Sequence, residues 1–102
     1  MDISDNSTAA GKNFIFQLFV TDDEPHGRRA KENLRTFCAS HVNESFKIEV
    51  VDVLKHFKIA LENKIFLTPA LVVVSPEPPL TIFGDLSDTQ QLIDALGLEG
   101  AA

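Results

Sequence analysis

The sequence has little sulfur, few cations and no long apolar run. Its single cysteine, Cys38, has no partner for an internal disulfide and no second thiol for a C-x-x-C redox pair. The longest uninterrupted apolar run, Ala70 to Val74, is far shorter than the roughly 20 residues that a membrane-spanning helix needs. Fifteen acidic residues stand against nine Lys and Arg, a formal net charge of −6, which repels nucleic-acid phosphates and anionic membranes. These features argue against a disulfide, a membrane span and a nucleic-acid partner.

Length and composition indicate one small domain. A chain of 102 residues that is 44% apolar can close a modest core without disulfides or metals. Residues 1–12 are rich in polar residues and predict a flexible tail, residues 13–98 the folded domain, and residues 99–102 a short C-terminal tail. No apolar leader precedes the domain, so we expect a cytoplasmic protein. Eight Phe with no Trp or Tyr predict that most aromatic rings are buried, since Phe has no polar group.

The first half predicts a strand, a helix and a second strand. FIFQLFV at 14–20 is nearly all apolar, as in a central strand buried on both faces. Thr21 to Pro25 supply capping oxygens, first-turn acids and a proline suited to a helix start. The helix is expected to bury five positions at helical spacing: Ala30, Leu34, Phe37, Cys38 and Val42. Alternation from Phe46 predicts a second strand nearer an edge, and the connection predicts a right-handed parallel βαβ unit.

The second half predicts a short helix, a hairpin and a last helix. Lys55–Asn63 is the expected short helix, and a proline-rich loop then joins ALVVV to LTIF as two hairpin strands. Ser87 with Gln90 predicts a capping box for a helix over Thr89–Leu96, and Gly97 predicts its left-handed C-terminal cap. The order β-α-β-α-β-β-α predicts an α/β, thioredoxin-like fold with a four-stranded mixed sheet.

The sequence predicts no catalytic residue, no metal site and no cofactor. Cys38 falls in the apolar stripe of the first helix, where a buried thiol is inert. His26, His41 and His56 are each fifteen residues apart and lack ligand spacing. Ser87 has no G-x-S-x-G surroundings, and its predicted capping role accounts for it.

Two groups of charges have two interpretations each. Arg28, Lys31 and Arg35 fall at i, i+3 and i+7, on one side of the first helix. They either dock an acidic partner or form an ordinary solvated face with Glu32. The same two interpretations apply to the short helix region, which carries Lys55, Lys58, Glu62 and Lys64.

Thr68 and Pro69 open the third predicted strand. Proline is tolerated at the first position of a strand, and thioredoxin-like domains place a cis-proline at this point. The residue pair therefore predicts either a cis peptide bond or a simple strand start. Gly84 and Asp85 turn the chain after the fourth strand.

Four strings, FQLFV, VVDVLK, KIFLTPALV and FGDLS, together resemble the KaiB family of bacterial clock proteins, over about residues 13–98. The resemblance implies a non-enzymatic protein that binds the hexameric, RecA-like ATPase KaiC and alters its phosphorylation or ATPase cycle. Catalysis then belongs to the partner. It also implies fold switching, in which the part after the second strand packs either in the thioredoxin-like way or in an alternative way, and the thioredoxin-like form binds the ring.

On this resemblance the partner-facing surface is expected on the second strand and the second helix. Its residues are Lys47, Glu49, Lys55, Lys58 and Lys64, of which only Lys55 and Lys64 stand in the matching strings. The residues expected to have structural roles are Thr68, Pro69, Gly84 and Asp85.

Other functions stay open from the sequence. A thioredoxin-like sensor module acting on a histidine kinase is the alternative, and a thiol enzyme using Cys38 is a third hypothesis. A homodimer or homotetramer, and a clock or a stress-response pathway, also stay open.

The last helix departs from the family pattern. Ala95 and Gly97 stand where the family commonly has a glycine and an aspartate. Replacing Gly by Ala inside a helix favours that helix by about 1 kcal/mol, enough to shift a near-balanced equilibrium several-fold. We therefore predict a resting state that is already thioredoxin-like.

Overall fold

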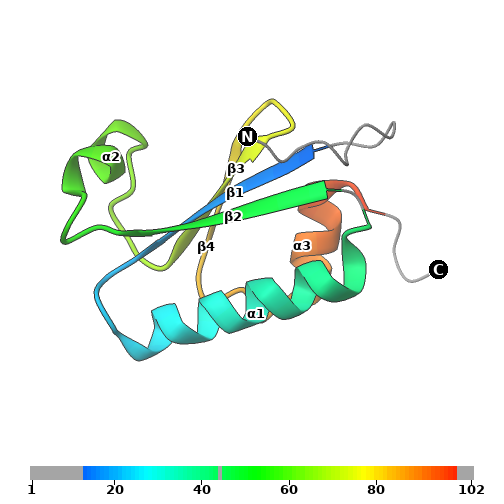
Figure 1. Ribbon diagram of the computed structural model, residues 1–102, viewed down its shortest axis with the longest axis horizontal. Helices are drawn as coiled ribbons and strands as arrows, with labels where there is room; N and C mark the ends of the chain where they lie inside the picture. Colours follow the sequence, from blue (N-terminus) through cyan, green and yellow to red (C-terminus); the bar gives the residue numbers. More distant parts are fainter. Residues whose placement is uncertain (1–12, 44, 99–102) are drawn as a thin grey trace.

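A four-stranded sheet forms the centre of the fold, and three helices surround it (Figure 1). The computed structural model describes residues 13–43 and 45–98. Within that part of the chain no helix is long and apolar enough to cross a membrane. The elements are β1 (Asn13–Val20), α1 (Pro25–His41), β2 (Ser45–Asp52), α2 (Phe57–Glu62), β3 (Ala70–Ser75), β4 (Leu80–Phe83) and α3 (Thr89–Leu96).

Strand β1 lies at the centre of the sheet, whose order is β2-β1-β3-β4. It pairs parallel with β2 and antiparallel with β3, and β3 pairs antiparallel with β4. A parallel neighbour requires a crossover, which α1 supplies. These pairings confirm the predicted central strand, the predicted edge position of the second strand and the predicted hairpin.

Alternate residues of β1 belong to two apolar clusters on opposite faces of the sheet. Phe14, Phe16 and Leu18 pack with buried residues of α1 and α3 in the larger cluster. Phe19 belongs to the smaller cluster, which includes Ala60 of α2. Helices α1 and α2 therefore pack on opposite faces of the sheet.

Helix α1 begins at Pro25, at the predicted point, and Glu24 is its N-cap. The Glu24 carboxylate accepts hydrogen bonds from the backbone N–H of His26 at 3.0 Å and of Gly27 at 3.3 Å. The prediction of acids in the first turn is wrong, because the acidic residues all precede Pro25 and the first turn contains none. One of them, Glu24, satisfies the free N–H groups from outside the helix instead.

Helix α2 is shorter than the predicted span of 55–63. The backbone N–H groups of Lys55 and His56 both donate to the carbonyl oxygen of Asp52. These bonds form a turn before the helix, which therefore begins at Phe57.

The predicted capping box at the start of α3 is wrong. Asp88 is the N-cap, and its Oδ1 accepts from the backbone N–H of Gln91 at 3.1 Å. Ser87 lies one residue too early, and its own N–H donates to Oδ1 of Asp85 at 3.0 Å. At the other end of α3, Gly97 has a φ of 68°, which confirms the predicted left-handed cap.

Candidate docking surface around α2

The segment between β2 and β3 exposes a large amount of apolar side chain. Single exposed apolar residues are common, but a concentration of them in one segment is typical of an interaction site. We call the five large apolar residues that are more than half exposed in this segment the α2 patch: Leu54 (64%), Phe57 (64%), Leu61 (55%), Phe66 (74%) and Leu67 (67%).

Only a few side chains anchor this segment to the sheet. Ala60 is the one buried residue of α2, and Ile65 follows the helix. Both belong to the smaller apolar cluster with Phe19 and Val51. Because a helix of this length presents one narrow side to the sheet, its remaining side chains stay in solvent.

Asp52 fixes the turn that leads from β2 into the segment. Its Oδ1 accepts from the backbone N–H of Leu54 at 2.9 Å and from that of Asp22 at 3.2 Å. These two hydrogen bonds favour the charged carboxylate and lower the pKa of Asp52 below its usual 3.8. The carboxylate is therefore ionised at neutral pH and holds the start of the segment next to the loop after β1.

Three of the predicted contact residues lie within the same segment as the α2 patch. Lys55 lies in the turn before α2, Lys58 in its first turn and Lys64 just after it, and all three are exposed. Cationic side chains thus alternate along the chain with the exposed apolar ones. The segment that contains α2, which lies at one end of the sheet in Figure 1, therefore exposes both apolar side chains and lysines.

The other two predicted contact residues, Lys47 and Glu49, lie on the edge strand β2. Lys47, Glu49 and Val51 are two residues apart along the strand, so all three side chains lie on the sheet face on which α2 packs. Glu49 accepts a hydrogen bond from Nε2 of Gln17 at 3.2 Å. Lys47 is about 13 Å along the strand from Val51, so this pair lies farther from α2 than the three lysines do.

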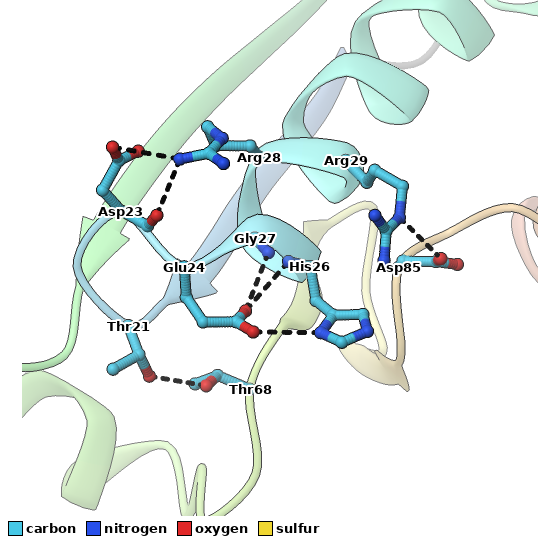
Figure 2. Close-up of polar contacts among 9 residues, drawn as sticks. All are labelled: Thr21, Asp23, Glu24, His26, Gly27, Arg28, Arg29, Thr68 and Asp85. Carbon is cyan, nitrogen blue, oxygen red and sulfur yellow. Dashed lines mark hydrogen bonds and ion pairs between the residues drawn. The ribbon is translucent and has the colours of Figure 1, made fainter.

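The residues with predicted structural roles meet beside the start of α1. The Thr68–Pro69 peptide bond is cis. The carbonyl oxygen of Pro69 accepts from the backbone N–H of Gly84 at 3.0 Å. The hydroxyl oxygens of Thr68 and Thr21 are 2.6 Å apart (Figure 2). The end of the α2 segment, the end of β4 and the loop after β1 are therefore joined at one point.

Asp85 connects this point to α1. Its carbonyl oxygen accepts from Nδ2 of Asn33 at 2.9 Å. Its Oδ2 lies 3.6 Å from Nε of Arg29, as Figure 2 shows for this pair. Hydrogen bonds from Ser87, and then the charge of Arg29, lower the pKa of Asp85 below its usual 3.8. The preceding Gly84 has a φ of 109°, a conformation that side chains rarely adopt. Through Asp85, the turn after β4 is therefore bonded to two residues of α1.

The single thiol, that of Cys38, lies on the sheet face opposite the one on which α2 packs. Cys38 is fully buried in the larger apolar cluster, as predicted. Burial raises the pKa of the thiol to about 11, so its protonated, unreactive form dominates at neutral pH. In the described part of the chain, no group of three or more His, Cys, Asp or Glu residues is placed to hold a metal ion.

The prediction that most Phe rings are buried is wrong. Four are buried, namely Phe14, Phe16, Phe19 and Phe37. The other four are 44–74% exposed, namely Phe46, Phe57, Phe66 and Phe83. A small sheet with one short helix on its second face has too little interior for eight rings.

The α2 patch was not predicted from the sequence, because the Phe rings in it were expected to be buried. The available signal was the apolar pair at 66–67, which stands outside every predicted helix and strand.

One protein-family model and two named relatives each match most of this chain. The model of the KaiB domain family matches residues 17–98. The circadian clock oscillator protein KaiB of Prochlorococcus marinus (strain MIT 9312) is 37% identical over 90 residues, which cover 88% of this chain and 86% of that protein. The protein of the same name from Gloeothece citriformis (strain PCC 7424) is 36% identical over 87 residues, covering 85% of this chain and 82% of that protein.

Solved structures resemble this fold. The N-terminal domain of Synechococcus elongatus SasA matches with a TM-score of 0.72 and 23% identity, covering 94% of this chain and 89% of that one. Mitochondrial thioredoxin 3 from Saccharomyces cerevisiae matches with a TM-score of 0.66 and 14% identity, covering 82% and 76%. At these identities the likeness establishes a thioredoxin-like fold, as predicted.

Proposed function

The chain belongs to the KaiB family, and from this premise we propose that it is a non-enzymatic regulator that binds a KaiC-type hexameric ATPase. In this proposal it modulates the phosphorylation or ATPase cycle of that partner, in a clock or a stress-response pathway in the cytoplasm. Family membership supports a clock-related regulator, and the α2 patch is the observation that supports binding.

The α2 patch has the composition of a protein interface. Specific interfaces combine a central apolar region, rich in aromatic anchors, with a polar rim. Here Phe57 and Phe66 supply the aromatic anchors. Lys55, Lys58 and Lys64 supply a cationic rim. The partner surface that fits is apolar at its centre and acidic around it, because oppositely charged rims attract during encounter.

The described residues support a binding role rather than catalysis. The only thiol, Cys38, is buried and protonated at neutral pH. The loop before α1 and the first turn of α1, where a redox thioredoxin carries its reactive thiols, together read TDDEPHG here. The Glu24 carboxylate in that loop already accepts the N–H groups at the helix start, so it occupies the position where the helix end would stabilise a thiolate.

A binding assay with purified variants tests the proposal. The full chain is incubated with a KaiC-type hexameric ATPase from the same organism, and bound protein and ATPase rate are both measured. We expect Phe57→Ser with Phe66→Ser, and separately Lys58→Glu with Lys64→Glu, to weaken binding at least about tenfold. Unchanged affinity in both double variants would remove the α2 patch from the proposal.

Matched controls separate loss of contact from general damage. Phe46 is also an exposed phenylalanine, but it belongs to the opposite sheet face from Val51. Phe46→Ser should leave affinity for the ATPase unchanged. Lys31→Glu with Arg35→Glu, on α1, changes the net charge by the same amount as the lysine reversal and should also leave it unchanged. Equal losses in all variants would point to charge or folding effects instead.

The sensor-module alternative predicts a different binding profile. Under it, a histidine kinase rather than the ATPase would be retained by the full chain and lost with the Phe57→Ser, Phe66→Ser variant. The likeness to the SasA domain bears on the fold alone, at 23% identity. The same preparations, analysed by light scattering, would distinguish a monomer from the dimer or tetramer that the sequence leaves open.

A further inference from the structure

The outer side of α1 carries a second charged surface. Arg28, Lys31 and Arg35 lie at i, i+3 and i+7, so they follow one side of the helix over about 10 Å. Together with Glu32 and Thr36 they line a shallow open hollow of about 530 Å³. We call these five residues the α1 hollow.

The α1 hollow concentrates positive charge on an acidic protein. The chain has a net charge of −6 with nine Lys and Arg in all. Helix α1 contains four of those nine cations, Arg28, Arg29, Lys31 and Arg35, but only one acid, Glu32. Arg29 does not line the hollow and instead lies 3.6 Å from Asp85. The lining of the hollow therefore contains three cationic side chains and one carboxylate.

Contacts with Asp23 orient Arg28, whereas Lys31 and Arg35 form no ion pair within the described residues. Nη1 of Arg28 donates to the carbonyl oxygen of Asp23 at 2.9 Å and lies 3.0 Å from its Oδ2, on the side of α1 away from Asp85 (Figure 2). Both contacts use Nη1, and within the part of the chain that the structure describes no hydrogen bond or ion pair uses the other guanidinium donors, Nη2 and Nε. Among residues 13–43 and 45–98, no ion pair within 4.0 Å involves Lys31 or Arg35.

We infer that the α1 hollow is a second docking surface, which binds a short acidic segment of a partner protein. The spacing of the cations favours such a segment, because side chains on one side of an extended peptide recur every 6–7 Å or so. Carboxylates of neighbouring Glu or Asp residues thus match cations spread over about 10 Å. A guanidinium also pairs with a carboxylate through two parallel hydrogen bonds, which adds geometric specificity.

The overall charge selects a short segment over a long polyanion. A nucleic acid or an anionic membrane extends well past the hollow and meets the acidic remainder of the protein. At physiological salt, charges beyond about 8 Å are screened, so a short acidic peptide feels mainly the local cations.

This surface is independent of the α2 patch. Helix α1 packs on the sheet face that contains Phe16, and α2 packs on the face that contains Phe19. Figure 1 shows α1 along the long side of the sheet and α2 beyond one end of it. An acidic segment on α1 and a partner on α2 can therefore bind together, and the inference stands whether or not the partner at α2 is a KaiC-type ATPase.

Fluorescence anisotropy with a labelled octaglutamate peptide tests this inference on the full chain. We expect saturable binding that weakens as salt is raised from about 50 mM to about 300 mM. Lys31→Glu with Arg35→Glu should weaken it at least about tenfold. The matched control, Lys58→Glu with Lys64→Glu, makes the same change in net charge on the other surface and should leave it within about twofold. An octaglutamine peptide should not bind.

Several outcomes would overturn the inference. Equal weakening by both double variants would show a response to net charge alone, and no binding of octaglutamate would remove the site. Tighter binding of a single-stranded oligonucleotide or of vesicles rich in phosphatidylserine would assign the hollow to a different class of ligand. If circular dichroism shows that the Lys31→Glu, Arg35→Glu variant is unfolded, Lys31→Gln with Arg35→Gln replaces it. This variant should also bind octaglutamate more weakly than the Lys58→Glu, Lys64→Glu control does.

Discussion

Replacing Phe66 with alanine should cost little stability although it removes a large apolar ring. Phe66 is 74% exposed, so folding removes only about a quarter of its surface from water. Full burial of such a side chain contributes about 1.5–3 kcal/mol, so Phe66→Ala should lower the free energy of unfolding by about 0.4–0.8 kcal/mol. The matched core variant, Phe16→Ala, removes a ring that is 0% exposed and should cost about 3–5 kcal/mol, because it also leaves a cavity.

Urea unfolding measures both variants. The chain has no Trp or Tyr, so far-ultraviolet circular dichroism is the suitable signal. With a urea dependence of about 1 kcal/mol per molar, usual for a small domain, Phe66→Ala should lower the midpoint by less than about 1 M. If Phe16→Ala does not fold, Phe16→Leu gives a milder core reference. A loss of more than about 2 kcal/mol for Phe66→Ala would refute the assignment of this ring to a docking surface.

Four further predictions follow from other parts of the fold. Gly27→Ala should lower the thermal midpoint, because the new Cβ would lie 3.1 Å from Cβ and Cγ1 of the buried Val20. Such overpacking costs about 1–3 kcal/mol. A thermal midpoint above that of the wild type would contradict this prediction. Cys38, whose thiol pKa is about 11, should react with a disulfide reagent at pH 8 only in denaturant, and equal rates in the native protein would refute the burial argument. The pKa of Asp85 is lowered by folding, so its stabilising contribution is complete above its unfolded value of 3.8 and is lost as pH falls through the folded value. An Asp85→Asn variant should therefore approach wild-type stability in acid, and a difference that stays constant down to about pH 2 would contradict the linkage. Ala95→Gly should destabilise α3 by about 1 kcal/mol. If the chain switches folds as the resemblance to KaiB implies, this variant should raise the population of the alternative packing several-fold, which backbone chemical shifts at 80–83 and 89–96 would report; shifts identical to wild type would contradict this expectation.

Prediction from the sequence worked where local rules and burial agree. The apolar run in β1, the proline at the start of α1 and Gly97 at the end of α3 each indicate a local conformation that the sheet and helices also need. It failed at Ser87, because Ser87 and Asp88 are both good N-caps and the turn at Asp85 decides between them. It failed again for the Phe rings, because composition indicates how apolar a ring is but not how much interior the fold provides.

The sequence by itself determined the order of strands and helices, the inert position of Cys38 and the resemblance to KaiB proteins, because each depends on residues close together along the chain. Only the tertiary structure decided which charges and rings face solvent together. The α2 patch and the α1 hollow lie on elements that pack on opposite faces of one sheet. Exposure depends on which faces the other elements cover, and that coverage exists only once strands distant in sequence have paired.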